Sequence, residues 1–193
     1  MVGTTGDGGR AVCAGGGPLR VAGCWRRGVE NAASAIWLLA PRTRKDRIQR
    51  RLRVALEDAK HATTAAQLIG DPPIALREMK ADIQAVATRA GVAITGMGNL
   101  TTQSVIQDAG ASFAMGANEA EFTWRALSAA AHGETWAIKS LPTHEVLGDP
   151  SGPIVTTRVT LDIVQIRFWA QRAMLLLDQA ERLYAVRSGR HHN

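Results

Sequence analysis

The stretch VAGCWRRGVENAASAIWLLAP, residues 21–41, decides the fold because its apolar side chains recur at helical spacing. Steps of three and four residues place such side chains in one stripe along a helix. Pro41 lacks a backbone N–H, so the helix ends before it. The stripe consists of Val21, Trp25, Val29, Ala32, Ile36 and Leu39. The sequence therefore predicts a long amphipathic helix over about residues 19–40.

The same spacing recurs outward from this stretch. It predicts further helices over about 43–69, 73–90, 101–109, 118–132 and 159–187, with Asn118 and Glu121 as a capping box. The last helix is expected to bury Ile163, Ile166, Ala170, Ala173, Leu177, Ala180 and Tyr184. Aromatic residues make up only 5% of the chain, and strand-favouring residues are sparse. We expect an all-α fold, a single bundle of about five main helices, with a long loop over 134–158 in which a short hairpin could form.

The ends of the chain differ from its middle. Residues 1–18 hold seven glycines and are expected to form a disordered tail, followed by one domain over 19–187 and a frayed end at 188–193. The longest apolar run, Ala32 to Ala40, is about half the length that a bilayer requires. With two cysteines and no zinc-ligand spacing, we expect a cytoplasmic protein without membrane contact, metal or cofactor.

The helix expected at 118–132 carries one narrow polar line. Arg125 and His132 are seven residues apart, which is nearly two turns, so they share a face about 10 Å apart along the axis. Ser128 falls between them, and Glu121 lies one turn earlier. An arginine can hold a phosphate while an imidazole moves a proton. Alternatively, Glu121 is a capping residue, Arg125 its salt-bridge partner and His132 a complement to the helix dipole.

The spacing R-x6-H from Arg125 to His132, closing in AHG, resembles the arginine-to-histidine motif of HEPN domains. Three stretches also resemble an uncharacterised actinobacterial HEPN-like group. They are RRGVENAASAIWLLAPRTRKDRIQRRLRVALEDAKH at 26–61, WRALSAAAHGETWA at 124–137, and the final helix ending in AERLYAVR. HEPN domains are helical bundles, often dimeric, and several are metal-independent ribonucleases. The resemblance spans roughly residues 20–187.

The resemblance implies that Arg125 would bind the scissile phosphate and His132 would transfer a proton. The 2′-hydroxyl of the RNA would be the nucleophile, a cyclic phosphate would result, and a homodimer would assemble the site. The residue after the arginine is often polar in active members, whereas this chain has Ala126. The expected function is a metal-independent endoribonuclease or RNA-binding protein of the toxin or stress-response type. The alternative is a non-catalytic module that binds a nucleotide or protein partner.

Other polar residues could support such a site. Arg27, Glu30 and Asn31 form a line on the first helix, and Glu30 could orient Arg125 or His132; the alternative is a solvated or helix-pairing face.

The run from 42 to 53 has seven basic residues against one acid, and Arg47, Arg50 and Arg51 could follow an RNA backbone. Such a run is also typical of a solvated helix face. The net charge of +6 permits an acidic partner. Sequence-specific DNA binding is not expected, because the turn in DIQAVATRAGVAITGM leads into a glycine-rich segment instead of a recognition helix.

Overall fold

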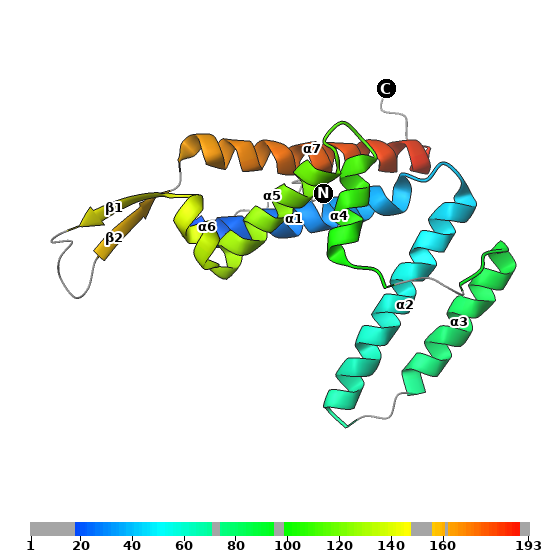
Figure 1. The fold of residues 1–193 in the computed structure, drawn as a ribbon. Helices are drawn as coiled ribbons and strands as arrows, with labels where there is room; N and C mark the ends of the chain where they lie inside the picture. Colours follow the sequence, from blue (N-terminus) through cyan, green and yellow to red (C-terminus); the bar gives the residue numbers. More distant parts are fainter. Residues whose placement is uncertain (1–17, 71–73, 95–98, 148–155, 161, 190–193) are drawn as a thin grey trace, which may run out of the picture.

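The computed structural model describes residues 18–70, 74–94, 99–147, 156–160 and 162–189. These residues form seven helices and one strand pair (Figure 1). In chain order they are α1 Pro18–Leu39, α2 Arg44–Leu68, α3 Ile74–Ala90, α4 Thr102–Ala111, α5 Ala117–His132, α6 Thr135–Ser140, β1 Thr143–Leu147, β2 Thr156–Thr160 and α7 Ile163–Ser188. The predicted all-α fold class is confirmed. Of the expected tail at 1–18, residues 1–17 lie outside the described residues and Pro18 begins α1; positions 190–193 also lie outside them.

Helix α1 is the centre of the body, and α4, α5 and α7 pack around it (Figure 1). The stripe predicted for α1 supplies the core, since Val29 and Ile36 are fully buried. They meet Ile106 of α4, Leu127 of α5 and Leu176 of α7 in one cluster. Burying an aliphatic side chain of this size stabilises the fold by about 1.5–3 kcal/mol. This cluster is therefore the main source of stability.

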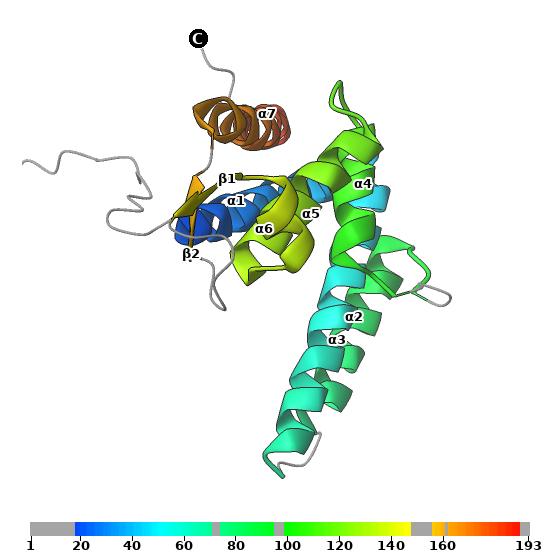
Figure 2. The same ribbon diagram turned by 60° about the vertical axis from the view of Figure 1, so that its left-hand side comes forward.

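Helices α2 and α3 form an arm that projects from the body (Figures 1 and 2). Thr43 caps α2, its hydroxyl accepting from the Asp46 N–H at 3.1 Å. The two helices pack mainly on each other around a second, smaller cluster. That cluster consists of Leu52, Ile83, Ala87 and Val92. The helices thus enclose two apolar clusters, where the sequence suggested one.

The long loop expected over 134–158 contains regular structure, including the short hairpin that the sequence left open. It contains α6 and the short hairpin of β1 with β2, which pair in antiparallel register from Thr143↔Thr160 to Leu147↔Thr156. The sequence TTRVT of β2 is rich in β-branched residues, which fit a pleated strand, and the prediction that the last helix begins at Val159 is therefore wrong for Val159 and Thr160. Helix α7 begins only at Ile163, where the Asp162 carboxylate accepts from the Val164 N–H at 2.8 Å.

The predicted capping box of α5 is also wrong. Helix α5 begins at Ala117 after Gly116, and no side chain caps it. A capping box occurs instead at α4, where Thr101 and Ser104 bond each other's backbone N–H groups. Asn118 therefore lies inside α5.

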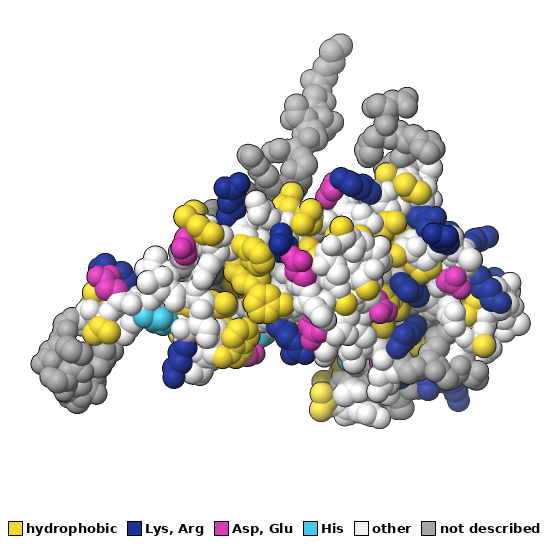
Figure 3. Space-filling view, turned by 45° about the horizontal axis from the view of Figure 1, so that its top comes forward, with side chains coloured by type: hydrophobic (Ala, Val, Ile, Leu, Met, Phe, Trp, Pro, Cys, Tyr) yellow, Lys and Arg dark blue, Asp and Glu magenta, His cyan; other side chains and the backbone are white. Residues whose placement is uncertain are grey.

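The buried face of α7 agrees with the predicted one only in part. Ala173 and Ala180 of the expected stripe are buried, but Ile163, Leu177 and Tyr184 are exposed, and Trp169 and Leu176 face the core instead. Hydrophobic side chains consequently gather on the surface that Figure 3 shows, over the part of the body that α7 crosses. Within the described residues, no helix is both long and apolar enough to span a bilayer.

Candidate functional site

Helix α5 presents the predicted polar line at an open edge of the body. It lies between α1 and α4 and ends at Gly133, which adopts φ +70° in the left-handed region that glycine favours. Its core side is made by Ala120, Thr123, Ala126, Leu127 and Ala129. Arg125 and His132 are exposed at the opposite edge.

His132 is joined to α1 through Arg26. Arg26 Nη1 lies 2.8 Å from His132 Nε2, and Arg26 Nε donates to Glu30 Oε1 at 2.9 Å. The same carboxylate oxygen accepts from Trp124 Nε1 at 2.8 Å. We call these four residues the His132 network. Because Trp124 and His132 belong to α5 and the other two to α1, the network ties the two helices together.

The contact between Arg26 and His132 has a preferred donor and acceptor. A guanidinium has only donors, so His132 Nε2 must accept the hydrogen bond from Arg26. With Nε2 as the acceptor, the tautomer that carries its proton on Nδ1 is assigned. An imidazole nitrogen whose lone pair is directed at an arginine can accept a proton once that arginine turns to a bound anion.

Arg125 belongs to a separate cluster facing α4. Glu121 Oε1 accepts from Arg125 Nε at 2.7 Å and from Gln103 Nε2 at 2.8 Å, and its other oxygen accepts from Gln107. The hydrogen bond from Arg125, followed by that from Gln107, lowers the pKa of Glu121 below its usual value. Half of the Arg125 side chain remains exposed, at 52%. No hydrogen bond between described residues joins Arg125 to His132.

The other supporting residues are placed as follows. Glu30 lies in the His132 network, as the sequence suggested it could, although its bonds go to Arg26 and Trp124 and not to His132 itself. Arg27 and Asn31 are exposed, and Ser128 is partly buried. Within the described part of the chain, the side chains of these three make no hydrogen bond. No hydrogen bond in the described part of the chain therefore supports the role predicted for these three residues.

Sequence reasoning missed Arg26 as a site residue. Its spacing of four from Glu30 was a visible signal for the ion pair, but nothing local indicated the contact with His132, 106 positions away. Ala126, which follows Arg125, is 1% exposed and lies in the core. A polar side chain at this position would be removed from water and would not reach the exposed polar line of α5.

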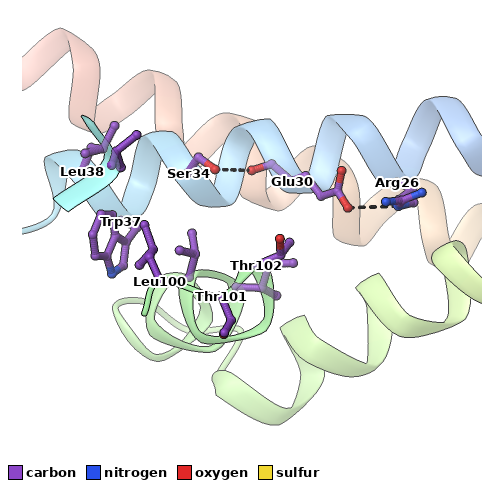
Figure 4. A pocket seen from close by; sticks show the side chains of 11 residues that line it. Arg26, Glu30, Ser34, Trp37, Leu38, Leu100, Thr101 and Thr102 are labelled. Atoms are coloured by element: carbon purple, nitrogen blue, oxygen red, sulfur yellow. Dashed lines mark hydrogen bonds and ion pairs between the residues drawn. The ribbon is translucent and has the colours of Figure 1, made fainter. Parts of the chain in front are cut away.

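A cavity of about 340 Å³ adjoins the His132 network (Figure 4). Arg26 and Glu30 lie at one end and Trp37 at the other, while Thr101 and Thr102 face α1 from the start of α4. Its apolar lining consists of Trp37, Leu38, Val54, Leu100, Val105 and Ile106. An apolar floor with a few polar groups at one end is typical of small-ligand sites.

Two of the three predicted RNA-binding arginines stabilise the α1–α2 turn. Arg47 Nη1 donates to the carbonyls of Pro41 and Arg42 at 2.9 and 3.0 Å. Arg50 donates to the Trp37 carbonyl and lies 4.8 Å from the centre of the Trp37 ring. Burial lowers the pKa of Arg50 against the raising effect of Asp108 and Asp46. Only Arg51 of the three is exposed.

Among the described residues, no three His, Cys, Asp or Glu side chains are grouped so that they could hold a metal ion. His191 and His192 lie outside that part of the chain. In comparisons with protein-family models, with curated protein sequences and with solved structures, nothing matches this chain.

Proposed function

We propose that this chain is an endoribonuclease of the HEPN type, in which His132 accepts the proton of an RNA 2′-hydroxyl. One observation carries the proposal: the imidazole Nε2 of His132 lies 2.8 Å from the guanidinium Nη1 of Arg26 at the surface. Arg26 keeps its Nε on Glu30, so its Nη groups can turn to a phosphate oxygen. That movement frees Nε2 for the proton.

The reaction needs no further group from this chain for its first step. The 2′-oxygen attacks the adjacent phosphorus while its proton passes to His132 Nε2. The bond from phosphorus to the 5′-oxygen breaks, and that oxygen takes a proton from solvent. The products are a 2′,3′-cyclic phosphate and a 5′-hydroxyl. Arg26 stabilises the charge on the phosphoryl oxygens, and Arg125 holds a neighbouring phosphate.

A variant series tests this assignment. Wild type, His132→Ala, Arg26→Ala and Arg125→Ala are incubated with RNA in EDTA, and products are examined for cyclic phosphate ends. We expect cleavage by the wild type, its loss in His132→Ala and Arg26→Ala, and weaker cleavage by Arg125→Ala. Ser128→Ala is the matched control on the same helix. Equal, slow degradation by all five proteins would refute the proposal.

The proposal includes a homodimer, as the resemblance implies. The exposed Phe122, 51% accessible, supports it, because this side chain lies next to the Arg125 line on α5 and packs on Trp169 of α7. If one copy supplies Arg125 and the other His132, mixing Arg125→Ala with His132→Ala restores part of the cleavage. A mixture that cleaves no faster than Arg125→Ala alone would place both residues of a site in one chain.

The second candidate is a non-catalytic module that binds a nucleotide. The cavity beside Arg26 and Glu30 favours it, since about 340 Å³ falls within the range of small-molecule sites. Calorimetric titration with nucleoside monophosphates distinguishes the two. Saturable binding that Thr102→Val weakens, with no RNA cleavage by the wild type, would favour the module.

A further inference from the structure

A second concave surface lies away from the His132 network, between the start of α2 and the end of α3. This basic groove is lined by Arg44, Lys45 and Ile48 of α2 and by Val86, Arg89 and Ala90 of α3. Its volume is about 460 Å³. Three of its six residues are cations, none is an acid, and the remaining three give it an apolar floor.

The three cations of the groove are exposed and available. Within the described part of the chain, no ion pair or hydrogen bond engages the side chains of Arg44, Lys45 or Arg89. By contrast, their neighbours Arg47 and Arg50 are committed to backbone carbonyls. Arg47 is only about 60° from Arg44 around α2, so it is its hydrogen bonds to the Pro41 and Arg42 carbonyls, and not the helical step, that separate it from the groove. Only the outward-facing cations remain free for a ligand.

The acids near the groove do not neutralise it. Asp46 lies two residues after Arg44, about 200° around α2, and so faces away. Asp82 shares the side of Arg89 on α3, but it lies about 10 Å away along the axis. The groove is therefore electropositive at close range, where a bound anion would be.

The row of positive charge continues beyond the groove. Arg51 follows Arg44 by seven residues, so it lies on the same side of α2 about 10 Å further along. Lys and Arg side chains gather at the right-hand end of Figure 3, the end at which Figure 1 places the start of α2. An extended row of cations suits a chain of phosphates better than a single one.

We propose that the basic groove between α2 and α3 binds the phosphate backbone of the RNA. The inference rests on the proposed function and deepens it, because it separates a backbone-holding surface on the arm from the reacting residues on α5. Backbone contacts of this kind are independent of base sequence. An anionic membrane is the less suitable partner, since surface-binding helices combine cations with bulky exposed apolar groups. Here the most exposed apolar groove residue that is bulky is Val86, at 38%.

Fluorescence anisotropy with a labelled 2′-O-methyl RNA tests the groove without interference from cleavage. The variants are Arg89→Gln and the double variant Arg44→Gln/Lys45→Gln. Arg77→Gln is the matched control, because Arg77 is exposed half a turn away from Val86 on the opposite side of α3. Thermal unfolding of each variant confirms that the fold is kept.

We expect the affinity of the groove variants for RNA to fall by a factor on the order of several-fold for each lost contact. The loss should be the same for all RNA sequences. The slope of log affinity against log salt should become shallower by about 0.7 for each contact removed. The Arg77→Gln control should match the wild type in both. Equal affinity and slope in all four proteins would overturn the inference. If the groove variants bind RNA like the wild type but bind anionic phospholipid vesicles more weakly, the inference is overturned as well.

The outcomes separate this inference from the proposed function. His132→Ala should bind the 2′-O-methyl RNA like the wild type and yet fail to cleave ordinary RNA. If His132→Ala still cleaves while the groove variants lose binding, the reaction assignment fails and the groove stands. If the groove variants bind normally while His132→Ala is inactive, only the groove is refuted.

Discussion

Gly110 sets how closely α4 approaches α5, and Gly110→Ala tests that packing. Gly110 is buried in the last turn of α4, and its carbonyl accepts from the Gly116 N–H at 3.0 Å. A Cβ at this position would lie 2.5 Å from the Cβ of Ala120 and closer still to the carbonyl oxygen of Gly116. Ordinary contacts begin at 3.4 Å. Because one clashing group is backbone and the other a Cβ, no flexible side chain can move aside.

The expected cost follows from two opposing terms. Forcing a methyl group into a well-packed site costs about 1–3 kcal/mol, and more where backbone must shift. Alanine regains up to about 1 kcal/mol of helix propensity over glycine. We expect a net destabilisation of about 1–3 kcal/mol for Gly110→Ala. Gly28→Ala is the matched control, since a Cβ there meets nothing within 4 Å inside α1. That substitution should stabilise the protein by up to about 1 kcal/mol.

Urea unfolding monitored by circular dichroism measures both changes. The two variants add the same methyl group to a helix, so opposite shifts in the unfolding midpoint isolate the packing term. A Gly110→Ala protein as stable as the wild type would show that α4 and α5 are not packed as described.

Two further predictions concern α7 and the Arg125 cluster. Leu176→Ala should lower the free energy of unfolding by about 2–5 kcal/mol because Leu176 is fully buried. Leu177 is 37% exposed, so Leu177→Ala should lower it by about 1 kcal/mol or less. Similar losses in urea unfolding would mean that the core packs against another face of α7. The pKa of Glu121 is lowered chiefly by Arg125, so its contribution to stability is present above the ordinary value of 4.5 and is lost as pH falls through the folded-state pKa. Unfolding midpoints across acidic pH should therefore fall less steeply for Glu121→Gln, and identical pH profiles would contradict the hydrogen bonding described.

The spacing of apolar residues was sufficient to predict most of the helices. It was not sufficient to predict which face of α7 is buried. In α1 the predicted stripe includes the fully buried Val29 and Ile36, so most of the buried side could be assigned before the partners were known, although Trp37 is also buried. Helix α7 has apolar residues around much of its circumference. The stripe through Ile163, Leu177 and Tyr184 satisfies the same spacing as the one through Trp169 and Leu176 that is buried. Only the shape of the neighbouring α1 distinguishes them.

The candidate site likewise has one part that the sequence predicts and one that it does not. The shared line of Arg125 and His132 follows from the helical repeat alone. The contact of His132 with Arg26 depends on how α5 crosses α1, which no local pattern contains. Likewise, Arg44 and Arg47 look equivalent in sequence, yet the turn before α2 leaves one in the basic groove and directs the other to backbone carbonyls.

The most direct test of the proposed reaction is cleavage of two RNA oligonucleotides that differ by one 2′-hydroxyl. The pair is identical except for a single 2′-deoxy sugar at the preferred cleavage position. The wild-type protein should cut the all-ribose strand there and leave a cyclic phosphate, and it should fail to cut at the deoxy position. Cleavage at both positions, or at neither, would contradict the transfer of a 2′-hydroxyl proton to His132.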